Sequence, residues 1–215
     1  MDIEQIHSKW IDWLDKIEER VMDLVLRRHV YREVVEIVKS NPRINVANVF
    51  HSLVHDTYIT YISVGIRQQL DTNQDAISLR KLLKELSEHS HIMTRRRYLT
   101  LYPPHYELRL ANKDFNRFAD PDAPYLNKNM VGKDMESLLS LAEPVKDFAD
   151  RSIIHNDRRG ITMSASFGDL DRCQDVLEQL VLKYVHLFRG AVMTTLVPAI
   201  QYDWKEILTH SWISS

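Results

Sequence analysis

Arg151 and His155 are the residues of this chain whose types and spacing best suit a chemical reaction. They lie four residues apart, so a helix would place both on one face, about one turn apart. A guanidinium group stays charged and binds phosphate in a bidentate fork, whereas an imidazole suits proton transfer near neutrality. One residue would stabilise anionic charge while the other moves a proton, without a metal ion. The pair is therefore a candidate catalytic site for cleavage of a phosphodiester.

Asn156, Asp157 and Arg158 follow the pair directly and are candidate substrate-binding residues. Basic residues at this place also have a structural explanation, because positive side chains interact favourably with the C-terminal end of a helix dipole. Gly160 fits the end of such a helix as a C-cap residue. Spacing alone favours the structural explanation, and both interpretations stay open.

Arg95, Arg96 and Arg97 form a second basic group and are also candidate substrate-binding residues. With Tyr98 and Tyr102 nearby, they could follow a nucleic-acid backbone while a ring stacks on a base. The alternative is a solvated helix end, which is the commoner reason for three consecutive arginines. The formal net charge of -2 excludes a strongly basic domain but is compatible with a local basic patch.

His51 and His55 are also four residues apart, with Asp56 beside them, and could provide two ligands of a metal site. Such a site in a helix bundle needs a further ligand from another helix, and no spacing in the sequence selects one. Partly buried histidines in a packed helix are the favoured interpretation, so we expect no metal. The chain also lacks a P-loop, a dinucleotide-binding fingerprint and a nucleophile elbow, so we expect no cofactor.

The single cysteine, Cys173, excludes an intrachain disulfide framework and is typical of a reducing compartment. It falls on the apolar stripe of a predicted helix, which favours a small buried side chain over a reactive thiol. Residues 1–4 lack the basic start and apolar run of a signal peptide, and no apolar stretch reaches the roughly 18–20 residues that span a bilayer. We expect a cytoplasmic protein without a membrane segment.

Composition and hydrophobic periodicity together predict an all-α fold. The 215 residues are 44% hydrophobic and 27% charged, and only five Gly and seven Pro interrupt them. Apolar residues recur at steps of three and four, as on one face of a helix. Residues 58–64 alone would read as a strand, but the periodic pattern around them runs for about 25 residues, longer than a usual strand. Helices are predicted over residues 2–39, 45–70, 79–86 and 170–188, and from Asp134 to Gly160.

Several residues mark predicted helix boundaries. Proline disfavours helical geometry in the residue before it, so Asn41-Pro42 ends the first helix. Ser78 is a predicted N-cap, because its hydroxyl can accept a hydrogen bond from a free backbone N–H. The other predicted features are a kink or a new helix start at Pro144, an N-cap at Asp169, a limit to the last helix at Pro198 and a short amphipathic tail around residues 203–208.

Helical periodicity fades between residues 89 and 129, where four of the seven prolines lie. A structureless connection of this length is unusual inside a compact domain. We therefore expect an irregular excursion with short helical turns, inside a single domain that spans residues 1–215. Aromatic side chains would pack it on the bundle: Tyr98, Tyr102, Tyr106, Phe115 and Phe118.

Three segments of the chain resemble the HEPN superfamily, and in particular the branch related to AbiU-type abortive-infection proteins. They are SVGIRQQLD at residues 63–71, DAISL at residues 75–79, which leads into a leucine-rich helix, and ADRSIIHND at residues 149–157. Together with the long N-terminal helix, the order and spacing of these segments extend over most of the chain. The resemblance implies a bundle of four or five helices that commonly dimerises.

The resemblance also implies roles for the candidate site. Many HEPN proteins are metal-independent ribonucleases with an Arg-X4–6-His motif, placed so that two protomers share one site. Carried over, His155 would transfer the proton, Arg151 would bind phosphate, Asn156 would occupy the motif's frequent polar position, and Asp157 would orient the site. In this chain three residues separate the arginine from the histidine, one fewer than the usual minimum.

Two functions from different classes follow from these patterns. The first is a HEPN-like protein of bacterial defence or toxin type, a homodimer that binds or cleaves RNA without a metal ion. The second is a non-catalytic helical interaction module that dimerises or binds a partner protein, since such members are well represented in the superfamily. In neither case do we expect a membrane partner.

Overall fold

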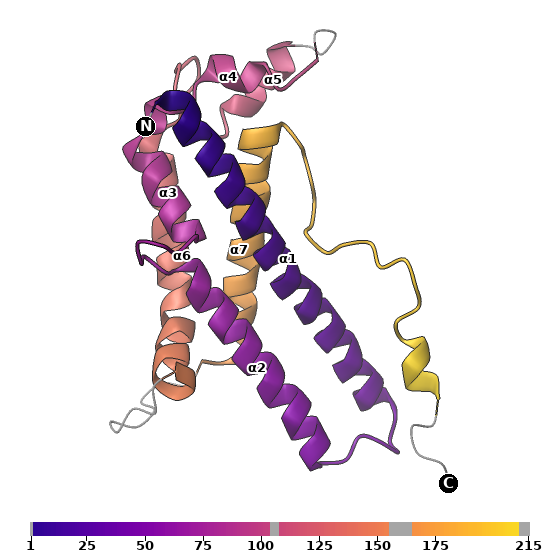
Figure 1. The fold of residues 1–215 in the computed structure, drawn as a ribbon. Helices are drawn as coiled ribbons and strands as arrows, with labels where there is room; N and C mark the ends of the chain where they lie inside the picture. Colours follow the sequence, from indigo (N-terminus) through magenta and orange to yellow (C-terminus); the bar gives the residue numbers. More distant parts are fainter. Residues whose placement is uncertain (1, 104–107, 155–164, 211–215) are drawn as a thin grey trace.

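The computed structural model describes residues 2–103, 108–154 and 165–210, which form an all-α fold without a β-strand (Figure 1). This confirms the fold class that the sequence predicted. The α-helices are α1 (Ile3–Ser40), α2 (Val49–Gln69), α3 (Leu79–Glu88), α4 (Arg95–Leu99), α5 (Leu108–Phe115), α6 (Lys128–Phe148) and α7 (Phe167–Arg189). Shorter turns are η1 (Ser90–Ile92), the π-helical turn η2 (Ala149–Ile154) and η3 (Glu206–Thr209).

The hydrophobic core lies between α1, α2, α3, α6 and α7. α6 packs against α2, α3 and α7, while α1 packs against α2, α3 and α7. Trp10 of α1 is fully buried, and its indole N–H donates a hydrogen bond of 2.7 Å to Glu85 of α3, so its polar atom is satisfied at the edge of the core. The remaining buried apolar residues of α1 follow the predicted helical spacing: Leu14, Ile17, Val21, Leu24 and Val25.

Side-chain caps begin most of the helices. Ser78 caps α3 as predicted, because its hydroxyl accepts a hydrogen bond from the backbone N–H of Lys81. At α7 the prediction was one turn too late, since Ser166 is the N-cap. Asp169 is the third helical residue, and its carboxylate accepts from the backbone N–H of Ser166, which completes a capping box.

The start of α6 differs from the prediction. α6 begins at Lys128 with Asn127 as its cap, six residues before Asp134. Pro144 lies inside α6 and so does not start a new helix; Ala142 and Val145 near it are buried, and their packing offsets the one hydrogen bond that proline cannot make. α7 ends at Arg189, within one residue of the predicted end, and Gly190 is its C-cap: its φ of 65° is left-handed, a conformation that glycine adopts without a Cβ clash.

The predicted excursion is confirmed for its described residues, up to the start of α6. It contains η1, α4 and α5, and Tyr98, Phe115 and Phe118 are buried against the bundle. Tyr102 is half-buried, and Tyr106 lies outside the described residues. The excursion forms the upper end of the molecule in Figure 1, beside the N-terminal end of α1.

After α7 the chain runs back along the bundle as an extended segment, residues 190–205, and ends its described part in η3 (Figure 1). Leu196 anchors it, because its side chain is buried and its backbone N–H donates to Glu178 of α7 at 2.8 Å. Lys205 pairs with Glu33 of α1. The predicted tail is therefore a short 3-10 turn fastened to α1.

Cys173 is fully buried on α7, as predicted. Its thiol donates to the backbone carbonyl of Leu141 at 3.0 Å. Burial raises the pKa of this thiol to about 12, so the thiolate that would make it reactive does not form near neutral pH.

Within residues 2–103, 108–154 and 165–210, none of the helices combines the length and the hydropathy of a segment that crosses a bilayer.

Candidate functional site

Arg151 lies in η2, where α6 continues into a wider π-helical turn. Such turns are rare and often occur at functional sites. The Arg151 side chain is half-exposed, and its Nη2 lies 3.4 Å from Oδ2 of Asp147 one turn earlier. His155, Asn156, Asp157 and Arg158 lie outside the described residues, as does Gly160.

Asp150 fastens this turn to α2. Its Oδ1 accepts a hydrogen bond of 2.6 Å from Nε of Arg67, and its Oδ2 accepts one of 2.7 Å from Nζ of Lys146. Burial alone would raise the pKa of Asp150, but the hydrogen bonds and charges of Lys146 and Arg67 outweigh it and hold the pKa below its usual value. The bridge joins two segments that are far apart in the sequence, one around Arg67 and one around Asp150.

Charges around Arg151 are nearly balanced among the described residues. Arg67 also approaches Asp71, with 4.0 Å between the charged atoms. Three cations (Arg67, Lys146 and Arg151) thus stand beside three carboxylates (Asp71, Asp147 and Asp150). The pair between Arg151 and Asp147 is exposed, and such pairs contribute little to stability. This contact with Asp147 could therefore be exchanged for one with a phosphate group at small cost.

The Arg95–Arg97 group is placed at the opposite end of the bundle from Arg151 (Figure 1). α6 separates the two ends by 21 residues, about 31 Å of helix. The structure therefore does not bring the two basic groups of the sequence into one site.

Arg95 holds the excursion together. Its guanidinium donates to three backbone carbonyls and one side-chain amide of residues 112–123, and it lies 4.7 Å from the ring centre of Phe115. Four of its five N–H donors are used in this way. Arg97 pairs with Glu4 of α1, whereas Arg96 is exposed. Of the three candidate substrate-binding residues here, Arg96 is the one whose side chain the structure leaves at the surface.

His51 and His55, the two candidate metal ligands, have other partners. Nδ1 of His55 lies 2.8 Å from the hydroxyl of Tyr31, and His51 contacts the Asn48 side chain. Across the part of the chain that the structure describes, no group of three histidine, cysteine or acidic side chains gathers in a geometry that could hold a metal ion.

Two polar contacts could not be read from the sequence because their partners are distant in it. Arg67 and Asp150 are 83 residues apart, and Tyr98 and His186 are 88 residues apart. The Tyr98 hydroxyl lies 2.9 Å from Nε2 of His186 inside the core, and burial lowers the pKa of His186. Only the packing of the excursion on α7 creates this contact.

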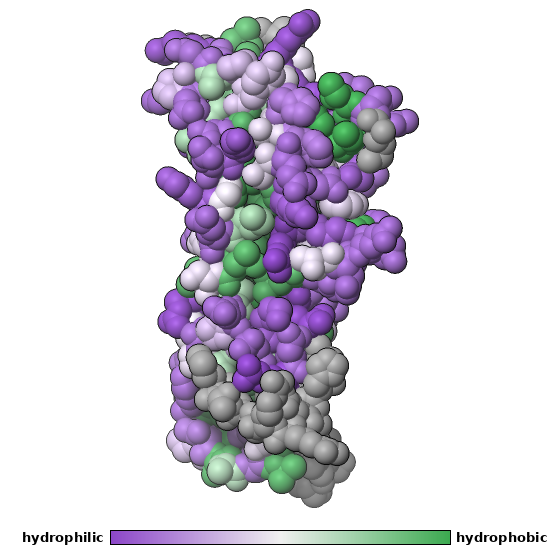
Figure 2. All heavy atoms as spheres, turned by 90° about the vertical axis from the view of Figure 1, so that its left-hand side faces the viewer, coloured by the Kyte–Doolittle hydropathy of each residue, from purple (hydrophilic) through white to green (hydrophobic). Residues whose placement is uncertain are grey.

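Exposed apolar side chains gather at one end of the molecule. The side that Figure 2 presents is mainly hydrophilic, with smaller groups of hydrophobic atoms between polar ones. By contrast, five large apolar residues are exposed within ten positions around the start of α2: Ile44, Val46, Val49, Phe50 and Leu53. The helical spacing of Val49, Phe50 and Leu53 in the sequence did not reveal that these side chains are exposed.

The geometry thus presents two candidate surfaces, the Arg151 turn and the apolar start of α2. Comparison with protein-family models, with curated proteins and with solved structures found no match to this chain.

Proposed function

We propose that the chain is a HEPN-like protein of bacterial defence or toxin type that binds or cleaves RNA at Arg151 and His155, without a metal ion. The observation that carries the proposal is the Asp150 bridge, because its short hydrogen bond with Arg67 of α2 holds the turn that carries Arg151 against α2, while Lys146 of α6 stabilises the same carboxylate. Catalysis depends on groups that are held in position before the substrate arrives, and the bridge holds the turn of Arg151 in this way.

In this proposal Arg151 binds the phosphate and His155 moves the proton. The guanidinium would exchange its exposed contact with Asp147 for a phosphate oxygen, which is favourable because an arginine fork fits phosphate closely. His155 would act as general acid or base on the ribose hydroxyl or the leaving oxygen. A second copy of the chain, related by a two-fold axis, would bring a second Arg–His pair to the same RNA.

The test is cleavage of cellular RNA by the purified chain in excess chelator. Arg151→Ala and His155→Ala should each lower the rate by about 10²–10⁴-fold, the usual contribution of a positioned catalytic group. Arg172→Ala is the matched control, because Arg172 is an exposed arginine of α7 that pairs with its near neighbour Asp169. Cleavage at full rate by the Arg151→Ala and His155→Ala variants would show that the assignment is wrong.

RNA binding is measured separately, so that binding without turnover is recognised. Fluorescence anisotropy with a labelled RNA should show weaker binding for Arg151→Ala and unchanged binding for Arg172→Ala. Loss of cleavage with unchanged binding would restrict the role of Arg151 to the reaction itself.

A second candidate function is a non-catalytic interaction module that binds a partner protein. The exposed apolar residues at the start of α2 favour it, because contiguous apolar surface on a folded protein commonly marks an interaction site. This function predicts no turnover and an association that survives His155→Ala. Loss of a partner upon His155→Ala would contradict it.

A further inference from the structure

The lower ends of α1 and α2 extend past the core of the bundle (Figure 1). The last buried residue of α1 is Arg28 and the first of α2 is Tyr58. Residues 29–57, called the α1–α2 tip below, therefore include twelve further residues of α1, about 18 Å of helix. Tyr31 and Tyr58 close the core at its base, with stacked rings whose centres are 3.8 Å apart.

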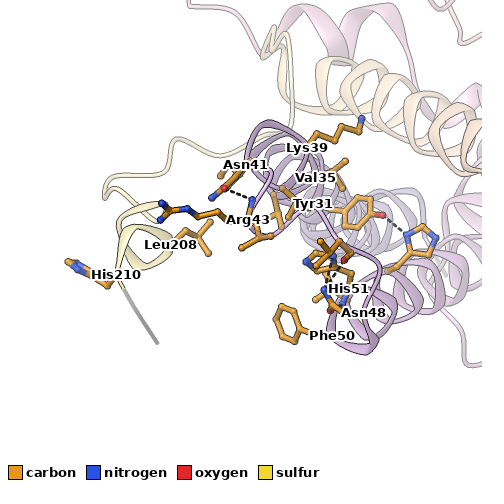
Figure 3. A pocket seen from close by; sticks show the side chains of 17 residues that line it. Tyr31, Val35, Lys39, Asn41, Arg43, Asn48, Phe50, His51, Leu208 and His210 are labelled. Atoms are coloured by element: carbon orange, nitrogen blue, oxygen red, sulfur yellow. Dashed lines mark hydrogen bonds between the residues drawn. The ribbon is translucent and has the colours of Figure 1, made fainter. Parts of the chain in front are cut away.

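A groove of about 630 Å³ runs along the α1–α2 tip. One wall is the last two turns of α1, whose apolar residues recur at the helical steps 31, 34, 35 and 38. The loop after α1 and the first turns of α2 form the other wall, and Leu208 of η3 lies at the rim (Figure 3). The apolar lining is Tyr31, Val34, Val35, Ile37, Val38, Ile44, Val46, Phe50, Val54 and Leu208.

The charged residues of this groove are of one sign. Lys39 and Arg43 line it together with three histidines, and none of the residues that line it is acidic. Lys39 pairs with Glu36, which does not line the groove, at 2.9 Å. Arg43 is exposed on the loop and, in Figure 3, lies beside Leu208 at the groove's rim. Such a surface in a chain of net charge -2 fits an apolar ligand with carboxylates along its edge.

The length of the groove fits a helix. Its α1 wall, from Tyr31 to Lys39, spans about 12 Å, or two helical turns. A helix of a partner would lay apolar residues at steps of three and four into the groove, the usual mode of helix recognition. We propose that the tip groove binds an acidic amphipathic helix of a partner protein, with apolar residues between Val35 and Phe50 and carboxylates facing Arg43.

Charge selects this occupant over two others. Residues 211–215, which follow His210 at the rim, read SWISS and bring apolar side chains but no acidic one. A second copy that docked by the same surface would set the positive rim against itself, which is unfavourable for close like charges. An acidic helix instead brings charge complementarity, which chiefly sets specificity and the rate of association.

An acidic helix in the groove would be the partner of the second candidate function, the interaction module. Its binding does not depend on the proposed RNA function. The groove is built from the α1–α2 tip and η3, whereas the proposed RNA site is built on η2. Variants in the groove can therefore be measured for RNA cleavage as well as for peptide binding. If cleavage fails and peptide binding holds, the RNA proposal alone falls.

The test uses the full chain and two synthetic peptides of about 16 residues, long enough to form a helix. Both carry Leu at steps of three and four, and the outer positions are Glu in one peptide and Lys in the other. In fluorescence anisotropy, the acidic peptide should bind with a Kd below about 100 µM. The basic peptide should bind at least about tenfold more weakly.

Two variants locate the peptide. Val38→Asp places a charge in the apolar wall and should abolish binding. Arg43→Glu lies on an exposed loop, where the fold tolerates it. It should weaken binding of the acidic peptide by about tenfold and strengthen binding of the basic peptide. Val192→Asp is the matched control, because Val192 is 71% exposed outside the groove, and this variant should bind like the unchanged chain.

Each contrary outcome is distinct. Equal binding of both peptides, or no binding of either at about 1 mM, would overturn the proposal. Binding that appears only after removal of residues 211–215 would mean that these residues occupy the groove. A dimer in sedimentation that Val38→Asp dissociates would mean that a second copy does. Unchanged affinities in Val38→Asp and Arg43→Glu would place the peptide elsewhere.

Discussion

Replacing Asp150 by asparagine removes the charge that holds η2 to α2 while keeping the size of the side chain. Asp150 accepts hydrogen bonds from Arg67 and Lys146 at 2.6 and 2.7 Å. A hydrogen bond to a charged group contributes about 1.5–3 kcal/mol. The side chains of Arg67 and Lys146 are 32% and 42% exposed, so solvent screening reduces both contributions. We expect Asp150→Asn to lower the free energy of unfolding by about 2 kcal/mol.

Urea denaturation followed by circular dichroism measures this loss. With a slope near 2 kcal/mol per M, 2 kcal/mol moves the midpoint by about 1 M. Asp147→Asn is the matched control on the same helix, because the pair between Asp147 and Arg151 is exposed on one helix face and should contribute less than about 0.5 kcal/mol.

The dependence on pH tests the cause. The pKa of Asp150 is lowered in the folded state, so its contribution is fully present above the unfolded value of about 3.9 and is lost as the pH falls through the lower folded value. The difference between the unchanged chain and Asp150→Asn should therefore be constant near neutrality and shrink below about pH 4. A loss below 0.5 kcal/mol, or one equal to that of Asp147→Asn, would refute the role of the bridge.

Three further predictions concern the core. A Cβ on Gly65 would overlap the buried side chain of Leu24, so Gly65→Ala should cost about 1–3 kcal/mol in urea denaturation, and a smaller residue at position 24 should recover part of it. Burial lowers the pKa of His186, so the unfolded state binds a proton at a higher pH than the folded state does. The free energy of unfolding should therefore fall as the pH drops below about 6.5. His186→Gln should reduce this fall, and an unchanged slope would show that His186 is not its cause. The Cys173 thiol, with its raised pKa, should not react with a thiol reagent until the chain unfolds, and fast labelling of the native state would contradict its burial.

The sequence predicted the helices well where apolar spacing and capping side chains are local features. Leu79 to Leu86 and the cap at Ser78 are examples, because an apolar stripe and a serine before it act within one helix. Boundaries set by tertiary packing were predicted less well. Pro144 does not start a new helix, because residues on both sides of it are buried and hold α6 together.

The candidate site was located only in part from the sequence. Spacing placed Arg151 on a helical segment, but it did not give the π-helical turn, the contact with Asp147 or the bridge from Asp150 to Arg67. It also grouped Arg95 with the substrate-binding candidates, whereas the structure gives its guanidinium four partners within the excursion. A charge in a sequence does not reveal which backbone carbonyls will surround it.

By itself the sequence determined the helical class of the chain, the N-cap of α3 and the burial of Cys173, because each depends on side chains within a few turns. Tertiary structure alone decided which residues meet. Arg67 reaches Asp150 across 83 positions, and the end of α1, the start of α2 and Leu208 of η3 line one groove. Periodicity shows that a helix has an apolar face but not what covers it, which is why the tip groove emerged only from the folded chain.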